Sequence, residues 1–213
     1  NRLARRDHSL DGKITSAAMR EFMDNGYVEA SLRKIAEHAG VTVGAIQTRY
    51  PSKDALFVSL LQPLLDDVET LFRNVKTDYY VHSDDFLAQL KSSMQRESTA
   101  IMQLIFAHYQ EAVLLFCCSA GSSMESYFDG IVKQKIGESI SFFRSAGHIH
   151  MDETLLGLLI SVQFDAYRRV IRECPDRQAA EAYMQVLMTY HLGGWTALFD
   201  SVHNQQEEHN HEI

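Results

Sequence analysis

The sequence predicts an all-α protein with a small three-helix domain followed by a larger helical domain. Apolar residues recur at helical spacing along most of the chain. Residues with high β propensity form no alternating runs, and there are only three prolines in 213 residues. Hydrophobic residues make up 46% of the chain, which is enough for a sizeable core. We expect about nine helices, of which the first three are short.

The first two predicted helices lie close together in the sequence. Apolar residues at helical spacing predict a helix over about residues 10–25, and Gly26 can end it in a left-handed conformation. Ser31 can cap a second helix over residues 31–39, because its hydroxyl can accept a hydrogen bond from a free backbone N–H. Gly40 can end this second helix as Gly26 ends the first.

A third short helix and a long fourth helix follow. Thr42 can cap the third helix, over residues 42–49, and Pro51 marks its end because a residue before proline disfavours helical backbone. Ser52 can cap the fourth helix, whose apolar residues continue for several turns. Pro63 lies inside this helix and can kink it.

The rest of the chain is expected to form longer helices. Residues 74–83 predict a loop, and Ser83 restarts a helix that runs to about residue 95. The segment 99–118 is apolar nearly all round, which predicts a helix buried on most sides. Three further helices are expected, over about residues 123–145, 153–173 and 177–201, the last two capped by Asp152 and Asp176. The expected domains are residues 1–52, 53–202 and a polar, disordered tail over 203–213.

Charge is distributed unevenly along the chain. Residues 1–60 hold nine Lys/Arg and seven Asp/Glu, a net charge of +2, whereas the remaining residues carry −10. Such asymmetry is a feature of chains in which one region meets nucleic acid. The three cysteines, two of them adjacent, argue against a disulfide framework. With no recognisable signal peptide or membrane span, a soluble and cytoplasmic protein is expected.

The second and third predicted helices, joined by Gly40 and Val41, have the spacing of a helix-turn-helix motif. In this motif the second helix lies in the major groove of DNA, and the flanking helix ends contact phosphates. We expect Ile46 and Tyr50 to point into the small core. The residues left to face DNA are then Thr42, Val43, Ala45, Gln47, Thr48 and Arg49.

Residues 14–56 have the sequence ITSAAMREFMDNGYVEASLRKIAEHAGVTVGAIQTRYPSKDAL. Three spaced motifs stand out in it: Ile14, Ala17, Ala18, Phe22, Gly26 and Tyr27, then Ser31, Arg33, Ile35, Ala36, Ala39, Gly40 and Val41, then Tyr50 to Lys53 with Ala55 and Leu56. In this combination and spacing, the region from residue 10 to residue 60 resembles the amino-terminal domain of the TetR family of bacterial transcription regulators.

The resemblance implies a dimeric regulator whose amino-terminal domain binds double-stranded DNA and whose helical carboxy-terminal domain binds a small effector. It implies that Arg33 contacts a base or a phosphate. Base edges are implied for Val43, Gly44 and Gln47, and mostly phosphate contacts for Ser31, Thr42, Thr48, Arg49 and Lys53, the last helped by the helix dipole. It also implies a homodimer interface formed by the last two long helices.

Three positions depart from the usual pattern of that family. Val43 stands where Lys or Arg is frequent, Ala45 where Thr or Ser is frequent, and Gln47 where Tyr is usual. Fewer phosphate anchors predict weaker non-specific affinity. A Gln can bond adenine through two hydrogen bonds, which is worth about 1–3 kcal/mol of discrimination, although it can also bond phosphate. The basic stretch over residues 1–7 can add an arm that grips the backbone or minor groove.

Polar residues that interrupt apolar helices in the larger domain are candidates for an effector pocket. The candidate ligand-binding residues, with their aromatic neighbours, are Phe106, Tyr109, Gln110, Phe128, Gln163 and Tyr167. Each could instead be an ordinary core or interface residue. Histidines near residues 148–150 and in the tail lack a full ligand set, so we expect no metal and no cofactor. No catalytic arrangement is recognisable, so we expect no enzyme.

The sequence therefore predicts a ligand-responsive transcription regulator, a repressor that binds a palindromic operator as a homodimer and is released by a small apolar effector. Two other classes stay open: a small-molecule-binding protein that has lost specific DNA binding, and a helical protein-interaction adaptor. An activator role is open as well, because the sequence does not encode the sign of regulation.

Overall fold

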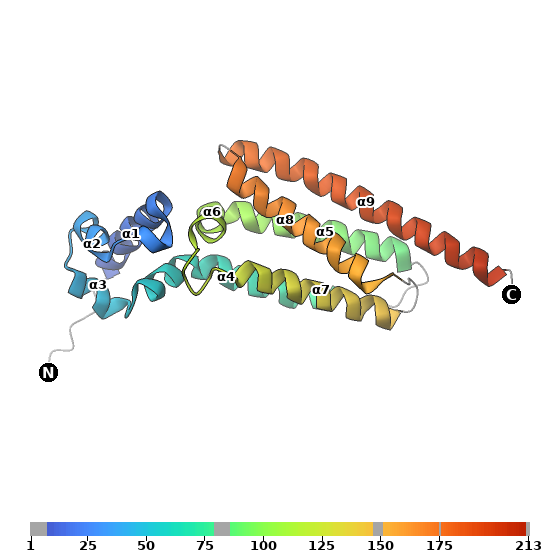
Figure 1. The fold of residues 1–213 in the computed structure, drawn as a ribbon, viewed down its shortest axis with the longest axis horizontal. Coiled ribbons are helices and arrows are strands. Elements are labelled where there is room, and N and C mark those ends of the chain that lie inside the picture. The colour runs from blue at the N-terminus through green and yellow to red at the C-terminus, as the bar shows by residue number, and fades with distance from the viewer. Residues whose placement is uncertain (1–7, 79–85, 147–150, 175, 212–213) are drawn as a thin grey trace. The chain divides into compact units, whose positions relative to one another are not determined.

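The computed structural model describes residues 8–78, 86–146, 151–174 and 176–211. Within these residues there are nine α-helices and no strand, so the predicted all-α class is confirmed (Figure 1). Contacts divide the chain into two units. The amino-terminal unit comprises residues 1–65 with 110–127, and the carboxy-terminal unit comprises residues 66–109 with 128–213.

The amino-terminal unit contains the predicted short helices. Its elements are α1 (His8–Glu29), α2 (Leu32–Ala39), α3 (Val43–Arg49), the first part of α4 (Lys53–Asp78) and most of α6 (Tyr109–Cys118). The predicted bounds of α2 and α3 hold to within one residue. The first helix continues beyond its predicted end, but Gly26 breaks its helical backbone with φ 71° and ψ 169°. Only glycine adopts such a conformation without strain.

A small aromatic and aliphatic core holds these helices together. Phe22 of α1 and Phe57 of α4 are fully buried, and their rings meet edge to face with centroids 5.0 Å apart. Ile35 of α2 and Ile46 of α3 are also fully buried. Each helix therefore contributes at least one side chain to one core, which fixes the position of the short third helix despite its length.

The carboxy-terminal unit is a bundle of long helices. It contains α5 (Phe86–Ala107), α7 (Tyr127–Ala146), α8 (Glu153–Glu173) and α9 (Arg177–His211), and α5, α8 and α9 run side by side (Figure 1). Asp152 caps α8, accepting from Leu155 N over 2.9 Å, and Asp176 caps α9 in the same way. The buried core of this bundle consists of Leu90, Leu156, Ile160, Phe164, Trp195 and Phe199.

Several helix boundaries differ from the prediction. The fourth helix extends to Asp78, where a loop was expected from residue 74, and residues 79–85 lie outside the described part of the chain. Helix α5 runs through residue 95 to Ala107, and the break comes instead at His108. No proline or glycine marks that break, so the sequence carried no local signal for it.

The last helix is longer than predicted. Helix α9 continues to His211, whereas the prediction ended it near residue 201 and placed a disordered tail from residue 203. The added residues are polar but contain no proline or glycine, so nothing in them ends a helix. Within the described residues, no single helix is long and apolar enough to cross a membrane; α5 and α6 reach that length and composition only when taken together.

Candidate DNA-binding surface and ligand cavity

Backbone and side-chain caps define the turn between α2 and α3. Ser31 Oγ accepts from the backbone N–H of Arg33 over 3.3 Å at the start of α2. Gly40 ends α2 in the left-handed region with φ 66°, and Thr42 Oγ1 accepts from Ala45 N over 3.1 Å at the start of α3. The predicted caps are confirmed. They set the short connection that a helix-turn-helix requires.

One face of α3 is buried and the opposite face is open. Ile46 is fully buried, as predicted, while Tyr50 is only half-buried at the end of the helix. The exposed positions at α3 and its cap are Thr42, Gly44, Gln47 and Thr48, and the half-buried ones are Val43 and Ala45. The face that the sequence assigned to DNA is thus largely accessible. Thr48 donates its hydroxyl to Gly44 O over 2.8 Å, which leaves its oxygen free to accept only.

Arg49 has a partner within its own domain. Its Nε donates to Asp11 Oδ1 of α1 over 2.7 Å, and a terminal nitrogen donates to Ala45 O over 3.1 Å. Its side chain is 12% exposed. Arg49 therefore joins the end of α3 to α1, and its predicted phosphate contact stays a prediction. The sequence could not indicate this, because Asp11 lies 38 positions away.

Lys53 is also engaged inside the domain. Its ammonium donates to the carbonyl oxygens of Tyr27, Val28 and Ala30 over 2.8, 3.0 and 3.1 Å. An ammonium has three donors, and these three carbonyls use all of them in this structure. Lys53 thus satisfies carbonyls at the end of α1, and its predicted phosphate contact stays a prediction. It also lies 4.6 Å from the centroid of the Tyr27 ring.

Arg33 and Ser31 differ in exposure and in their contacts within the domain. Arg33 is exposed on α2, and its guanidinium pairs with no acidic side chain among the described residues. Ser31 is half-buried, and its backbone N–H donates to Glu21 Oε1 over 3.2 Å. Glu21 is only 3% exposed and lies 4.0 Å from Lys34 Nζ. Glu21 is not among the predicted site residues, because a buried acid on an apolar helix face has no local signature.

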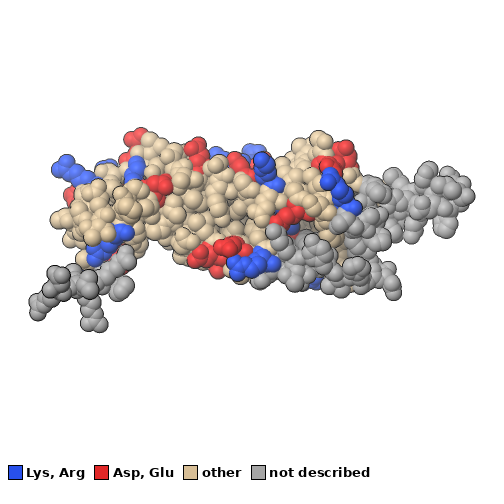
Figure 2. All heavy atoms as spheres, turned by 90° about the horizontal axis from the view of Figure 1, so that it is seen from below, with Lys and Arg blue, Asp and Glu red and all other residues tan. Residues whose placement is uncertain are grey.

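Charges of both signs are mixed on the surface. On the face drawn in Figure 2, Lys and Arg side chains are interspersed with Asp and Glu, and its described residues form no continuous basic area. The basic arm predicted over residues 1–7 lies outside the described residues.

A third contact joins α4 to the segment after α6. Asp54 accepts from the backbone N–H of Ser123 over 2.9 Å and from its hydroxyl over 2.7 Å. These two hydrogen bonds hold the pKa of the Asp54 carboxyl below its usual value. The segment around Ser123 also lies close to α1, because a Cβ added at Gly121 would come within 2.7 Å of Val28.

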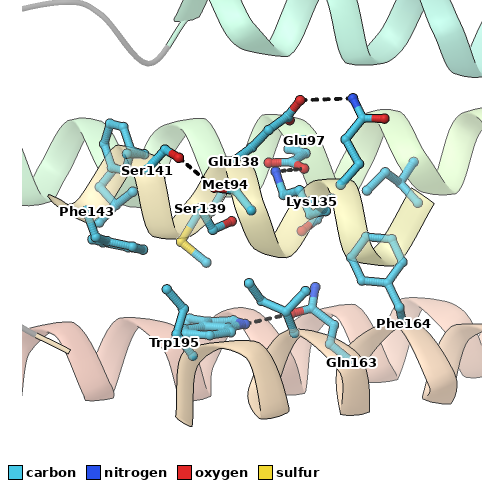
Figure 3. Close-up of a pocket in the computed structure, with 18 of the residues that line it drawn as sticks. Met94, Glu97, Lys135, Glu138, Ser139, Ser141, Phe143, Gln163, Phe164 and Trp195 are labelled. Carbon is cyan, nitrogen blue, oxygen red and sulfur yellow. Dashed lines mark hydrogen bonds and ion pairs between the residues drawn. The ribbon is translucent and has the colours of Figure 1, made fainter. Parts of the chain in front are cut away.

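The carboxy-terminal unit contains a cavity of about 870 Å³ that is partly open to solvent. It is lined by α5, α7, α8 and α9, and most of the lining is aliphatic or aromatic (Figure 3). Trp195 Nε1 donates to Gln163 Oε1 over 2.6 Å, and Gln163 Nε2 donates to the hydroxyl of Tyr167 over 2.9 Å. Burial raises the pKa of Tyr167 to about 12. This hydrogen-bonded chain joins α8 to α9 at the cavity wall.

The cavity uses few of the predicted ligand-binding residues. Gln163 lines it, and Tyr167 reaches it only through Gln163. Phe128 packs against the core beside the cavity. Phe106 and Tyr109 stack on each other with centroids 5.7 Å apart, away from the lining, and Gln110 is exposed in the other unit. These five positions are not among the lining residues. The part of α5 that lines the cavity precedes Phe106 and consists of Leu90, Met94, Glu97, Ser98 and Ile101.

Three residues that line the cavity, one each from α5, α7 and α9, are not among the predicted ligand-binding residues. Glu97 of α5 and Lys135 of α7 form an ion pair at the cavity, with side chains 12% and 13% exposed (Figure 3). Trp195, the single tryptophan of the chain, lies on the opposite wall. Ion pairs between helices far apart in sequence have no local signal. A single Trp on an apolar face was the one available hint.

Metal-binding groups are absent from the described residues: no three His, Cys, Asp or Glu side chains lie close enough to hold an ion. The candidate histidines at 148 and 150 and in the tail fall outside the residues whose side chains the structure describes. Cys118 is buried, and burial raises the pKa of its thiol to about 11, as expected for an unreactive cysteine.

Large exposed apolar side chains gather on two helices. Among the described residues, they are Leu155, Leu158 and Val162 of α8, Tyr183, Val186 and Tyr190 of α9, and Val28 of α1. Those of α8 and of α9 recur at helical spacing, so each helix presents one apolar stripe. Gly193 and Gly194 follow the apolar stripe of α9 along the helix, and no atom lies within 4 Å of where a Cβ would stand at either glycine.

The capped turn, the buried Ile46 and the open polar face of α3 are the geometry of a helix-turn-helix DNA-binding domain. Residues 14–60 match the family described as bacterial regulatory proteins, tetR family. The chain has the amino-terminal domain and the fold of TetR-family transcriptional regulators, which confirms the resemblance predicted from the sequence. Members of that family are regulators and not enzymes, in agreement with the expectation from the sequence.

Individual relatives agree with this assignment. The HTH-type transcriptional regulator YuxN of Bacillus subtilis (strain 168) is 34% identical over 64 residues, which are 30% of this chain and 22% of that protein. The match thus spans about a fifth of that relative's length.

Two solved structures share the fold over most of their length. The TetR-family transcriptional regulator PfmR of Thermus thermophilus matches with a TM-score of 0.53 and 18% identity, over 83% of this chain and 97% of that one. The transcriptional regulator FadR of Bacillus subtilis, in complex with stearoyl-CoA, matches with a TM-score of 0.55 and 18% identity, over 86% and 98%.

Proposed function

We propose that the protein is a homodimeric, ligand-responsive transcription regulator that acts in the cytoplasm as a repressor. Two helix-turn-helix domains bind the two half-sites of a palindromic operator. A small effector binds the cavity of the carboxy-terminal unit and lowers operator affinity. The observation that carries the proposal is the accessible face of α3, which is fixed by two caps and the Arg49–Asp11 ion pair.

We assign contacts with DNA bases and phosphates to the residues of α2 and α3 according to the exposure of their side chains. Gln47 meets a base edge, with adenine as the favoured base because its amide can donate and accept at once. Arg33 contacts a base or a phosphate from α2. The residues proposed to contact phosphates or the wall of the major groove are Ser31, Thr42, Val43, Gly44, Ala45 and Thr48. Arg49 and Lys53 act by holding α3 and the start of α4 in place, and backbone N–H groups at the start of α4 are available to a phosphate.

The dimer is proposed to form through α8 and α9. Each helix carries three large apolar side chains that are 44–72% exposed, an arrangement that an isolated chain in water does not favour. The two glycines at 193 and 194 let a second helix approach α9 closely. A second copy of the chain is the occupant, since a two-fold dimer supplies the two reading domains that a palindrome requires.

Effector control is proposed for the cavity. Its volume is within the range of small-molecule sites, and its lining combines ten aliphatic or aromatic residues with eight polar or charged ones. FadR of Bacillus subtilis, which has the same fold, was solved in complex with stearoyl-CoA, and this supports a ligand-binding role for the fold. An effector changes operator affinity only to the extent that it binds the two conformations differently.

Selection from random-sequence duplex DNA tests the proposal. We expect the wild type to enrich a two-fold symmetric site and its affinity to fall with salt. The double variant Arg33→Ala/Gln47→Ala should lose enrichment, while Arg20→Ala, an exposed arginine on α1, should keep it. Failure of the folded wild type to enrich any site at low salt would contradict the proposal and favour a protein that binds small molecules alone.

A further inference from the structure

The side chains on the open side of α3 carry no charge. The one charged residue of this helix is Arg49, whose Nε donates to Asp11 over 2.7 Å and whose side chain is only 12% exposed. The open side offers an amide and a hydroxyl at exposed positions and short apolar groups at half-buried ones. Its residues are Val43, Gly44, Ala45, Gln47 and Thr48.

Guanine and cytosine have no charged partner on this side of α3. In the major groove, the usual partner of guanine is an arginine or lysine that donates to O6 and N7, and that of cytosine is a carboxylate that accepts from N4. The exposed cations of α2 and α3 are Arg33 and Lys34, and both belong to α2. In this motif the first helix crosses the DNA backbone. A G·C base pair beneath α3 therefore gains no charged contact from that helix.

Adenine and thymine do have matching partners on α3. The Gln47 amide can donate to adenine N7 and accept from N6 at the same time, and the C5 methyl group of thymine is contacted by apolar side chains. Val43 and Gln47 are four residues apart, so they lie on one side of the helix with about 5–6 Å between their Cβ atoms. Because successive base pairs are about 3.4 Å apart, the two side chains can meet base pairs one or two steps apart.

Gly44 has no reason within the fold to be a glycine. It lies two residues before the buried Ile46, which places it on the outward side of α3. A Cβ at this position would meet nothing nearer than Thr42 Oγ1 at 3.9 Å, and φ is not positive. Glycine is less favourable than alanine in a helix. The missing side chain instead lets the helix backbone approach a partner closely, which brings Val43 and Ala45 within reach of base edges.

We infer that α3 reads A·T base pairs, with the Gln47 amide bound to an adenine and Val43 and Ala45 packed against thymine methyl groups. Each operator half-site then contains an A·T-rich segment beneath α3. The inference rests on the proposed function, because it takes α3 as the helix that reads DNA, and it deepens that function by naming the base pairs that are read. A guanine bound by Arg33 would lie outside this segment, because Arg33 belongs to α2.

Replacement of single thymines by deoxyuridine tests the methyl contacts, in the duplex that random-sequence selection enriches. Deoxyuridine pairs as thymine does and lacks only the C5 methyl group. We expect at least one thymine in each half-site at which the replacement weakens binding about three- to fivefold, the effect of withdrawing one buried methyl group. Affinities are compared by fluorescence anisotropy at one salt concentration. Binding that uridine leaves unchanged at every position would overturn the inference.

The variant Val43→Ser locates one methyl contact. It replaces the apolar side chain by a small polar one, so we expect equal affinity for the thymine and uridine duplexes at the position that Val43 contacts. Val28→Ser, at an exposed valine on α1, is the matched control and should keep the wild-type difference. A Val43→Ser variant that discriminates thymine from uridine as well as the wild type does would contradict the contact.

The variant Gln47→Arg tests the adenine contact. Arginine donates to O6 and N7 of guanine, so repeated selection with this variant should exchange adenine for guanine at one position of each half-site. The other positions should keep their wild-type bases. An adenine preference that persists at every position in Gln47→Arg would show that Gln47 does not read adenine.

The variant Gly44→Ala tests the close approach of the α3 backbone. We expect operator affinity to fall by about tenfold, comparable to the loss of one base-pair contact. The melting temperature should not fall, because alanine suits a helix and the added Cβ meets no close neighbour. Operator affinity equal to that of the wild type would contradict the close approach.

The selected sites separate this inference from the proposed function. The positions that α3 reads are those at which Gln47→Ala or Val43→Ser relaxes the base preference. A·T pairs at these positions support the inference. An enriched palindrome with G·C pairs at these positions would overturn the inference and leave the proposed function standing. The absence of any enriched site for the folded wild type would contradict both.

Discussion

Arg49, the last residue of α3, donates from Nε to Asp11 of α1 over 2.7 Å, so the end of the second helix of the helix-turn-helix is tied to the first helix of its domain. A charged pair of this length with a largely buried arginine is a strong, directional contact. It explains why a helix of seven residues can hold one orientation. Arg49 therefore has two possible roles: it can hold α3 in position, or it can contact a phosphate of DNA.

The variant Asp11→Asn distinguishes these two roles. If Arg49 mainly contacted phosphate, removal of a nearby acid would strengthen DNA binding. Because Arg49 instead positions α3, we expect Asp11→Asn to weaken operator binding by about tenfold, measured by fluorescence anisotropy. Asp24→Asn, an exposed acid on the same helix, should leave affinity unchanged or slightly raised. Tighter binding by Asp11→Asn would contradict the positioning role.

Lys53 and Arg33 are expected to give opposite results when substituted. Lys53→Gln removes the donor to three carbonyls at the end of α1, so we expect the free energy of unfolding to fall by about 1–3 kcal/mol. Arg33→Ala should leave stability unchanged, since its side chain is exposed. It should reduce the salt dependence of DNA binding by about one unit if it meets a phosphate.

Chemical denaturation and salt titration of DNA binding measure these two effects. A stable Lys53→Gln variant with a reduced salt slope would show that Lys53 contacts phosphate after all.

The Asp54–Ser123 contact predicts a pH dependence of stability. The folded-state pKa of Asp54 lies below its ordinary value, so its contribution is present above about pH 3.8 and is lost as pH falls through the lowered pKa. We expect Asp54→Asn to lower the melting temperature at pH 7 by about 2–4 °C. The melting curves of variant and wild type should converge as pH falls below about 3.8 and through the lowered pKa of Asp54. A difference that stays constant over this whole pH range would rule out this ionisation.

The apolar stripes of α8 and α9 predict a dimer that charge can disrupt. We expect the double variant Leu158→Glu/Val186→Glu to sediment as a monomer at concentrations where the wild type is a dimer. Its operator affinity should fall by more than about tenfold, because each domain then binds one half-site alone. Val28→Glu, a similarly exposed apolar position on α1, is the matched control. A wild type that sediments as a monomer would contradict the proposed interface.

The sequence predicted the helix-turn-helix more accurately than the cavity, for a physical reason. Caps such as Ser31, Thr42 and Asp152 act over two or three residues, so they can be recognised from the sequence, and the structure confirms each of them. The roles of Arg49 and Lys53 depend on partners 38 and 23–26 positions away, which no local pattern indicates. Both residues fit a surface interpretation until the fold brings their partners close.

The cavity shows the same limitation in stronger form. Gln163 was found because a polar residue interrupts an apolar helix, but Glu97 and Lys135 look like ordinary charged residues of amphipathic helices. Only the packing of α5 against α7 shows that they face each other away from water. Phe106 and Tyr109 were predicted from their positions beside polar residues in an apolar helix, a pattern that does not distinguish a core face from a cavity wall.

The central claim, that the open face of α3 reads a specific DNA sequence, is tested most directly by sequencing the genomic fragments that the protein captures at two salt concentrations. We predict an enriched palindrome that is weakened by salt, lost in Arg33→Ala/Gln47→Ala and retained in Arg20→Ala. Equal capture of all fragments by the wild type and the double variant would contradict the claim, as would no capture at low salt by a folded dimer.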